Sequence, residues 1–143
     1  MKIALLGYGK MGKTIEQIAL KRGHEIVLKI DNDHTDYDIT QADVAIEFST
    51  PNSAFANISN CLRHRVPVVA GTTADENIIP IEAKRIGNTP GTHIVTYSSD
   101  IDTIEIKHTA HNRNGFALGA VIAAEWLLNK KGTYSMKDVL NLK

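Results

Sequence analysis

The amino-acid sequence predicts an α/β fold in which a parallel sheet covered by helices is followed by antiparallel strands. In the first half of the chain, short apolar runs end in glycine or polar turns, and segments with helical spacing separate them. After about residue 77 the pattern changes, because apolar and polar residues then alternate with period two. A chain of 143 residues is long enough to bury one such core.

The first part of the chain predicts a doubly wound sheet. Four apolar runs bounded by turn residues are typical of buried parallel strands, and they cover residues 3–6, 25–30, 43–48 and 66–70. Helical spacing predicts one helix from Met11 to Arg22, with Gly23 as its stop, and another that runs to about Arg63. The second helix begins at Thr50-Pro51, an N-cap residue followed by proline at the first helical position.

The second part predicts an antiparallel meander over residues 79–85, 92–97 and 103–108, with Pro90-Gly91 as a turn. Residues 116–128 are apolar nearly all round, which predicts a buried helix whose C-terminus is suited by Lys130, Lys131 and Gly132. A last short helix is expected over residues 135–140, with Ser135 as its N-cap. We therefore expect an α/β domain over residues 1–77 and 112–143, and antiparallel strands over 78–111.

Composition excludes several classes of partner. Lys plus Arg and Asp plus Glu are both 16, so bulk charge favours neither a nucleic-acid nor a membrane partner. No apolar stretch approaches the length of a membrane span. The single cysteine, Cys61, has no partner for an internal disulfide, so we expect a reducing compartment, the cytoplasm.

A glycine-rich turn carries the clearest functional signal. It follows the first predicted strand and opens the first predicted helix, and it consists of Gly7, Tyr8, Gly9, Lys10, Met11 and Gly12. With Asp31 ending the second strand, this is the context of the Rossmann-type dinucleotide fingerprint. Gly7 permits the tight turn, Gly9 lets the pyrophosphate approach the backbone, and Gly12 lets the helix lie close to the strand.

Asp31 also bears on the choice of dinucleotide. Its carboxylate is suited to the ribose hydroxyls and would repel a 2′-phosphate, which favours NADH over NADPH. Lys10 and Lys13 compensate in part, so use of either cofactor stays open. The alternative is a glycine-rich turn that merely packs.

Two other strand ends are expected at the same edge of the sheet. They are Phe48-Ser49-Thr50 and Gly71-Thr72-Thr73, whose hydroxyl and N–H groups suit the ribose and nicotinamide. For the first of them, a helix cap without any ligand is an equal alternative. We expect no metal site, because His108 and His111 do not share a face of a strand and no cysteine or carboxylate cluster joins them.

With these motifs, the chain resembles the 4-hydroxy-tetrahydrodipicolinate reductase (dihydrodipicolinate reductase) family. The resemblance covers MKIALLGYGKMGKTIEQIA, DVAIEFSTP, VPVVAGTT, the stretch RIGNTPGTHIVTYSSDIDTIEIKHTAHNRNGFALGAVIAAEWL, and YSMKDVL. It implies NAD(P)H-dependent hydride transfer to a cyclic dicarboxylate imine, and a homotetramer built through the sheet of the second domain. It carries cofactor contacts over to Gly7, Gly9, Lys10, Met11, Gly12, Asp31, Phe48, Ser49, Thr50, Gly71, Thr72, Thr73 and, near the active site, Arg113.

The chain departs from the family after Thr73. The family has a long segment there, with an Asn-Phe-Ser turn, a His-His pair and a Lys…Asp-Ala-Pro-Ser-Gly-Thr stretch that binds substrate carboxylates and supplies the proton donor. Here Ala74 to Asn77 lead directly into Ile78, so no catalytic residue carries over. Because a dianionic imine needs positioned cations and a proton donor, we expect little or no reductase activity.

Four interpretations stay open. The chain is a shortened family member that binds nucleotide without catalysis, or an active oxidoreductase with a rearranged site or a smaller substrate. A third is a structural or regulatory subunit that oligomerises through residues 79–108. The fourth is that the gene product contains the absent segment and behaves as an ordinary reductase.

Overall fold

The computed structural model describes residues 1–31, 36–71, 82, 84, 86, 87 and 89–142. The chain divides into two compact units, and each is described separately below. The first comprises Met1–Asp75 and Asn114–Lys143, and the second comprises Glu76–Arg113.

The first unit is built on a parallel sheet of four strands. In spatial order they are β2 (Glu25–Ile30), β1 (Lys2–Leu6), β3 (Val44–Glu47) and β4 (Val68–Ala70). This order places β1 and β3 side by side at the centre of the sheet, with β2 and β4 at its edges. The predicted parallel α/β architecture is confirmed.

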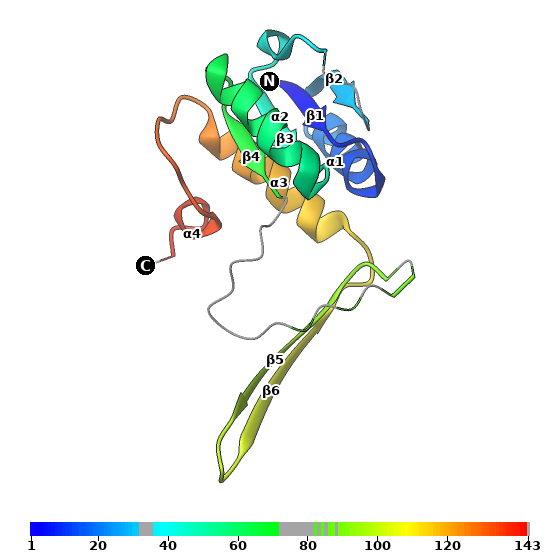
Figure 1. Cartoon of the computed structure of the whole chain (residues 1–143), viewed down its shortest axis with the longest axis vertical. Coiled ribbons are helices and arrows are strands. Elements are labelled where there is room, and N and C mark those ends of the chain that lie inside the picture. Colours follow the sequence, from blue (N-terminus) through cyan, green and yellow to red (C-terminus); the bar gives the residue numbers. More distant parts are fainter. Residues whose placement is uncertain (32–35, 72–81, 83, 85, 88, 143) are drawn as a thin grey trace. The chain divides into compact units, whose positions relative to one another are not determined.

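Helices cover both faces of this sheet (Figure 1). Their bounds are α1 (Lys10–Lys21), η1 (Ile39–Gln41), α2 (Pro51–Arg63), α3 (Asn114–Leu127) and α4 (Met136–Val139). Gly23, with φ of +80°, follows the end of α1 as predicted. Thr50 and Pro51 open α2 as predicted, although the Thr50 side chain makes no capping hydrogen bond to the helix backbone.

The alternation of side chains along the strands divides the core into two layers. Ile3, Leu5, Val44 and Ile46 point to the face covered by α1 and α3, and they form one buried cluster with residues of those helices. The intervening residues of β1 and β3 point to the opposite face. The buried cluster there contains Ala4, Leu6, Ala45, Ile39, Ala42, Cys61 and Val66.

Helix α3 is less buried than its sequence predicts. Its alanines and Val121 pack against the sheet and α1, but Phe116 and Leu118 are 39% and 38% exposed. The expectation of burial on all sides was therefore wrong, because a single sheet face covers one side of a helix. The end of α3 also differs: the left-handed residue after it is Asn129, with φ of +62°, and Gly132 lies further along the chain.

The second unit contains an antiparallel hairpin of β5 (Thr92–Ser98) and β6 (Thr103–Thr109) (Figure 1). These are two of the three predicted meander strands. The predicted strand over residues 79–85 lies outside the described residues, except for Glu82 and Lys84, which are not in a strand.

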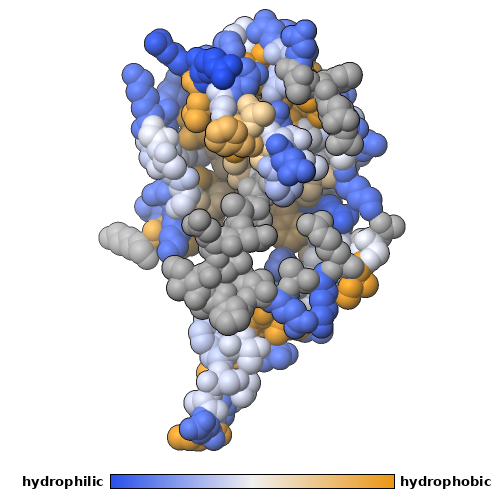
Figure 2. All heavy atoms as spheres, in the orientation of Figure 1, coloured by the Kyte–Doolittle hydropathy of each residue, from blue (hydrophilic) through white to orange (hydrophobic). Residues whose placement is uncertain are grey.

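The surface is mostly polar on the face drawn in Figure 2, and apolar side chains interrupt it over α2. Phe55 and Leu62 of α2 are 82% and 65% exposed. Among the helices in the described part of the chain, none is long and apolar enough to cross a membrane.

An ionic cluster links the end of α1 and the start of β2 to α3. The Arg22 guanidinium donates two hydrogen bonds of 2.7 Å to the Glu125 carboxylate, and His24 Nε2 lies 2.6 Å from Glu125 Oε1. The Arg22 hydrogen bonds hold the pKa of Glu125 at about 2, against the opposing effect of burial, and His24 adds to the lowering. The cluster thus fixes α3 against α1 through charged groups that sit at the edge of the core.

We predict that Glu125→Gln lowers the free energy of unfolding at pH 7. Because the Glu125 side chain is 27% exposed, the expected loss is discounted for screening to about 1 kcal/mol. A carboxylate with a depressed folded pKa stabilises above its unfolded pKa, so the difference between wild type and variant shrinks as pH falls from about 4.5 toward 2. Urea unfolding between pH 7 and pH 3 measures it, with Glu25→Gln at the exposed start of β2 as control. A difference that does not change over this range would contradict the prediction.

Candidate functional site

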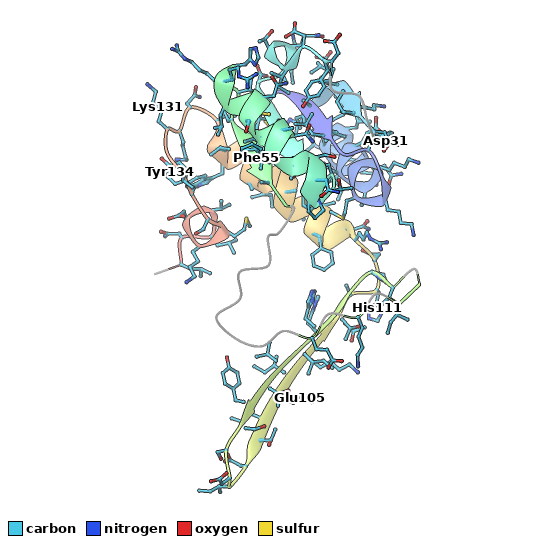
Figure 3. The ribbon with its side chains drawn as sticks, in the orientation of Figure 1. Asp31, Phe55, Glu105, His111, Lys131 and Tyr134 are labelled. Atoms are coloured by element: carbon cyan, nitrogen blue, oxygen red, sulfur yellow. The ribbon has the colours of Figure 1, made fainter. Side chains whose placement is uncertain are left out.

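The candidate site lies at the edge of the sheet where the parallel strands end. Backbone hydrogen bonds join the residues that follow neighbouring strands: Gly7 N–H donates to the Ile30 carbonyl at 2.8 Å, and Phe48 N–H donates to the Leu6 carbonyl at 2.8 Å. Gly71 N–H donates in the same way to the Glu47 carbonyl, at 2.9 Å. Asp31, exposed and labelled in Figure 3, follows the end of β2 beside this row.

Backbone and ring contacts at this edge leave no room for side chains at three glycines. Gly7 has a φ of +100°, and a Cβ on it would lie 2.3 Å from the Phe48 carbonyl oxygen. A Cβ on Gly12 would lie 2.4 Å from the Gly7 carbonyl oxygen, and one on Gly71 would lie 2.1 Å from the Phe48 ring. Gly7, Phe48 and Gly71 therefore form one continuous surface across β1, β3 and β4.

Gly9 is different, because nothing lies within 4 Å of a Cβ placed on it. It is exposed at the turn and is the N-cap of α1, whose first intrahelical bond runs from Lys13 N–H to the Gly9 carbonyl. The backbone N–H groups that precede this bond and the positive end of the helix dipole face the same edge. Lys10 is exposed at the first helical position, and Met11 packs against the core below it.

The Tyr8 side chain is directed along α1. Its hydroxyl donates to the Glu16 carboxylate, which also pairs with the Lys29 ammonium at 2.5 Å. Hydrogen bonds from Lys29 and Tyr8 lower the pKa of Glu16, and the bond to Glu16 raises the pKa of Tyr8. The positive charge of Lys29 is thus balanced within the protein by Glu16.

The turn between β3 and α2 is held by the buried side chain of Glu47. The N–H of Ser49 donates to Glu47 Oε1 at 2.9 Å, and the Ser49 hydroxyl donates to the same oxygen. Thr50 is exposed at the N-cap of α2, with its hydroxyl 3.1 Å from the Ser53 hydroxyl. Sequence reasoning missed Glu47, although a carboxylate that ends an apolar strand was a signal available in the sequence.

Three of the residues expected at the site lie outside the described part of the first unit. Thr72 and Thr73 lie outside the described residues. Arg113 belongs to the second unit, where its guanidinium lies 3.5 Å from the Thr89 carbonyl oxygen.

A row of backbone groups and a helix N-terminus at the carboxyl edge of a parallel sheet is an arrangement that suits an anionic ligand. It lies between β1 and β3, where the chain leaves the sheet toward opposite faces. The fold and this edge define an α/β protein of the Rossmann-like class.

Comparison with known proteins makes the assignment more specific. The family model described as "Dihydrodipicolinate reductase, C-terminus" matches residues 11–140. A 4-hydroxy-tetrahydrodipicolinate reductase of Christiangramia forsetii is 37% identical, covering 99% of this chain and 98% of that protein. The protein of that name from Thermosipho africanus is 28% identical over 98% of both chains. One from Methanosarcina barkeri is 52% identical over 65 residues, 45% of this chain and 25% of that protein.

The chain therefore belongs to the dihydrodipicolinate reductase family. The alignment with the Christiangramia forsetii protein is 234 positions long, whereas this chain has 143 residues. A long internal part of that relative thus has no counterpart here, which confirms that this is a shortened member.

The glycine contacts predict losses of stability of different size for two similar substitutions. Gly12→Ala is expected to lower the free energy of unfolding by about 1 to 3 kcal/mol, the usual cost of forcing extra atoms into a packed site. Gly9→Ala is the matched control and is expected to cost less, about 0.5 kcal/mol, because nothing crowds a Cβ there and only the preference for glycine over alanine at an exposed N-cap is lost. Urea unfolding of the two variants measures both values, and equal losses would show that the Gly7–Gly12 contact is not tight.

Proposed function

We propose that this chain binds a pyridine dinucleotide at the carboxyl edge of the sheet and does not catalyse the reduction for which its relatives are named. The observation that supports binding is the continuous surface formed by Gly7, Phe48 and Gly71 beside the N-terminus of α1. The pyrophosphate would lie against the exposed backbone at Gly9, and Asp31 would accept hydrogen bonds from the adenosine ribose. Lys10, Met11, Thr50, Thr72, Thr73 and Arg113 are further contacts in this proposal.

The preference for NADH over NADPH rests on charge. Asp31 is exposed at the end of β2, and its carboxylate would repel a 2′-phosphate. Lys29 is engaged with Glu16, so its ammonium is poorly placed to offset that repulsion. Lys10 and Lys13 remain close enough in sequence to allow weaker binding of NADPH.

The loss of catalysis rests on the gap in the alignment. The relative's additional length has no counterpart in this chain, and the family segment with the His-His pair and the Pro-Ser-Gly-Thr stretch is absent from the sequence. Without it, the chain has no evident group to hold two substrate carboxylates or to protonate the ring nitrogen. Orientation and acid catalysis each contribute orders of magnitude in rate.

The test is a fluorescence titration with NADH. Wild type is expected to show saturable binding, and Gly9→Ala is expected to weaken it at least about tenfold, because a methyl group would stand where the pyrophosphate approaches the backbone. Unfolding measurements on the same variant confirm that the folded state is intact. If wild type shows no saturation at millimolar NADH, the proposal of a dinucleotide site is wrong.

A turnover assay on the same sample separates the remaining interpretations. With 4-hydroxy-tetrahydrodipicolinate and NADH or NADPH, we expect no oxidation of cofactor above background, and the Christiangramia forsetii relative serves as positive control. Turnover at a rate typical of enzymes would favour an active oxidoreductase with a rearranged site. An intact mass well above 15.7 kDa would show that the absent segment is present after all.

Assembly is a second part of the proposal, and the β5–β6 hairpin supports it. The register places Val95 opposite Ile106 and Tyr97 opposite Ile104, so these four side chains share one face. All four are exposed, from 45% to 64%. Because a two-stranded hairpin is marginally stable alone, we infer that this face packs against other copies of the chain, as the family's tetramer implies.

We predict that Ile106→Lys shifts the protein to a smaller assembly at micromolar concentration. A buried ammonium in the middle of the apolar face would be costly to desolvate. Glu105→Lys, on the neighbouring residue but on the opposite face (Figure 3), is the control and is expected to leave the assembly unchanged. Sedimentation velocity measures both, and a monomeric wild type would contradict the proposal.

A further inference from the structure

Glu47 is a carboxylate in a position where the strand pattern places a core residue. Strand β3 directs Val44 and Ile46 to the face covered by α1 and α3. Glu47 follows Ala45 on the other face and is fully buried, at 0% exposed. Burying a carboxylate costs free energy unless hydrogen bonds compensate for the lost water. The groups that donate to Glu47 therefore indicate which part of the structure it holds in place.

Among the described residues, both hydrogen bonds that the Glu47 carboxylate accepts come from Ser49. The Ser49 N–H and hydroxyl donate to Oε1. Oε2 is buried, and in the described part of the chain it is the buried side-chain atom for which no hydrogen-bond partner is found. The carboxylate therefore interacts with its protein surroundings mainly through the turn that follows β3.

A chain of side-chain hydrogen bonds continues from this turn. Asn57 of α2 donates from Nδ2 to the Ser49 hydroxyl at 3.3 Å, and Tyr37 donates to Asn57 Oδ1 at 2.9 Å. Tyr37 lies in the segment that crosses from β2 to β3. The network therefore links the crossover, the β3–α2 turn and α2 to the buried carboxylate.

The consequence for the edge of the sheet is geometric. Because the polar groups of Ser49 are turned inward, Phe48 is held with its carbonyl against Gly7 and its ring against Gly71. These are the contacts that make one surface of three strand ends. A rotation of the Ser49 backbone would move the Phe48 carbonyl directly, since the two residues share a peptide bond.

We propose that Glu47 is a positioning residue that holds the Phe48–Ser49 turn in its ligand-binding shape, with Ser49 as its link and not a cofactor contact. The proposal rests on the proposed dinucleotide site. It assigns Ser49 a role different from the one that its place at a strand end suggests.

Two variants at Glu47 test the proposal. Glu47→Leu removes the acceptor at similar size, and Glu47→Gln keeps an acceptor oxygen but removes the charge. NADH binding is expected to weaken about tenfold or more in the leucine variant, because it cannot accept the hydrogen bonds from Ser49. In the glutamine variant it is expected to weaken by only a few-fold, because a neutral acceptor oxygen remains. Glu25→Gln is the control and is expected to leave the affinity unchanged. If both Glu47 variants lose stability while the folded fraction keeps the wild-type Kd, the residue is merely structural and the proposal is overturned.

A double-variant cycle tests the role of Ser49. If Glu47 acts through Ser49, Ser49→Ala adds little to the loss of affinity that Glu47→Leu already causes. Fully additive losses would show that Ser49 touches the cofactor independently, which overturns its assignment as a link.

Amide hydrogen exchange separates this proposal from that of the dinucleotide site. In the unliganded protein, the Ser49 N–H is expected to be protected and to lose that protection in the Glu47 variants, whereas amides in the middle of β1 stay protected. Unchanged Ser49 exchange in Glu47→Leu overturns the positioning role whether or not wild type binds NADH. Faster exchange combined with no NADH binding by wild type would support the role of Glu47 in the turn but reject its link to a ligand.

Discussion

The close approach of backbone and ring atoms at the ends of the parallel strands is the constraint on which the rest of the first unit depends. The Phe48 carbonyl occupies the space of a Gly7 side chain, and the Gly7 carbonyl occupies that of Gly12. These contacts require glycine, and they bring α1 close enough for Ile15 and Ala19 to join the core with β1 and β3. The same contacts turn three separate strand ends into one surface.

The sequence was sufficient to predict the sheet because each strand and helix carried its own local signal. Apolar runs ending in glycine or polar turns marked the four strands. Gly23 marked the end of α1, and Pro51 marked the beginning of α2. The burial of α3 was a different kind of problem. Its apolar composition shows which surfaces tend to be buried. The exposure of Phe116 and Leu118, however, depends on which other elements pack over them, and a local sequence pattern carries no information on that.

The candidate site shows the same division between local and tertiary information. The glycine turn and Asp31 were predictable because the spacing of a strand, a turn and a helix defines them. The orientation of Ser49 was not, because a hydroxyl at a strand end suits a ligand or a neighbour equally well. Here the neighbour is Glu47, the last residue of β3, which is buried on the face of the sheet across which α2 packs.

The arrangement is compatible with the proposal that this shortened member keeps one function of its family without the other. The contacts that shape the glycine edge are made within residues 1–71, and α3 returns to cover the sheet beneath it. None of these contacts needs the part of the relative that has no counterpart here. The second unit differs from the first in this respect, because its β5–β6 hairpin has an exposed apolar face that needs a partner to cover it. The proposal therefore assigns binding of a dinucleotide and chemistry on a substrate to different segments of the family's chain.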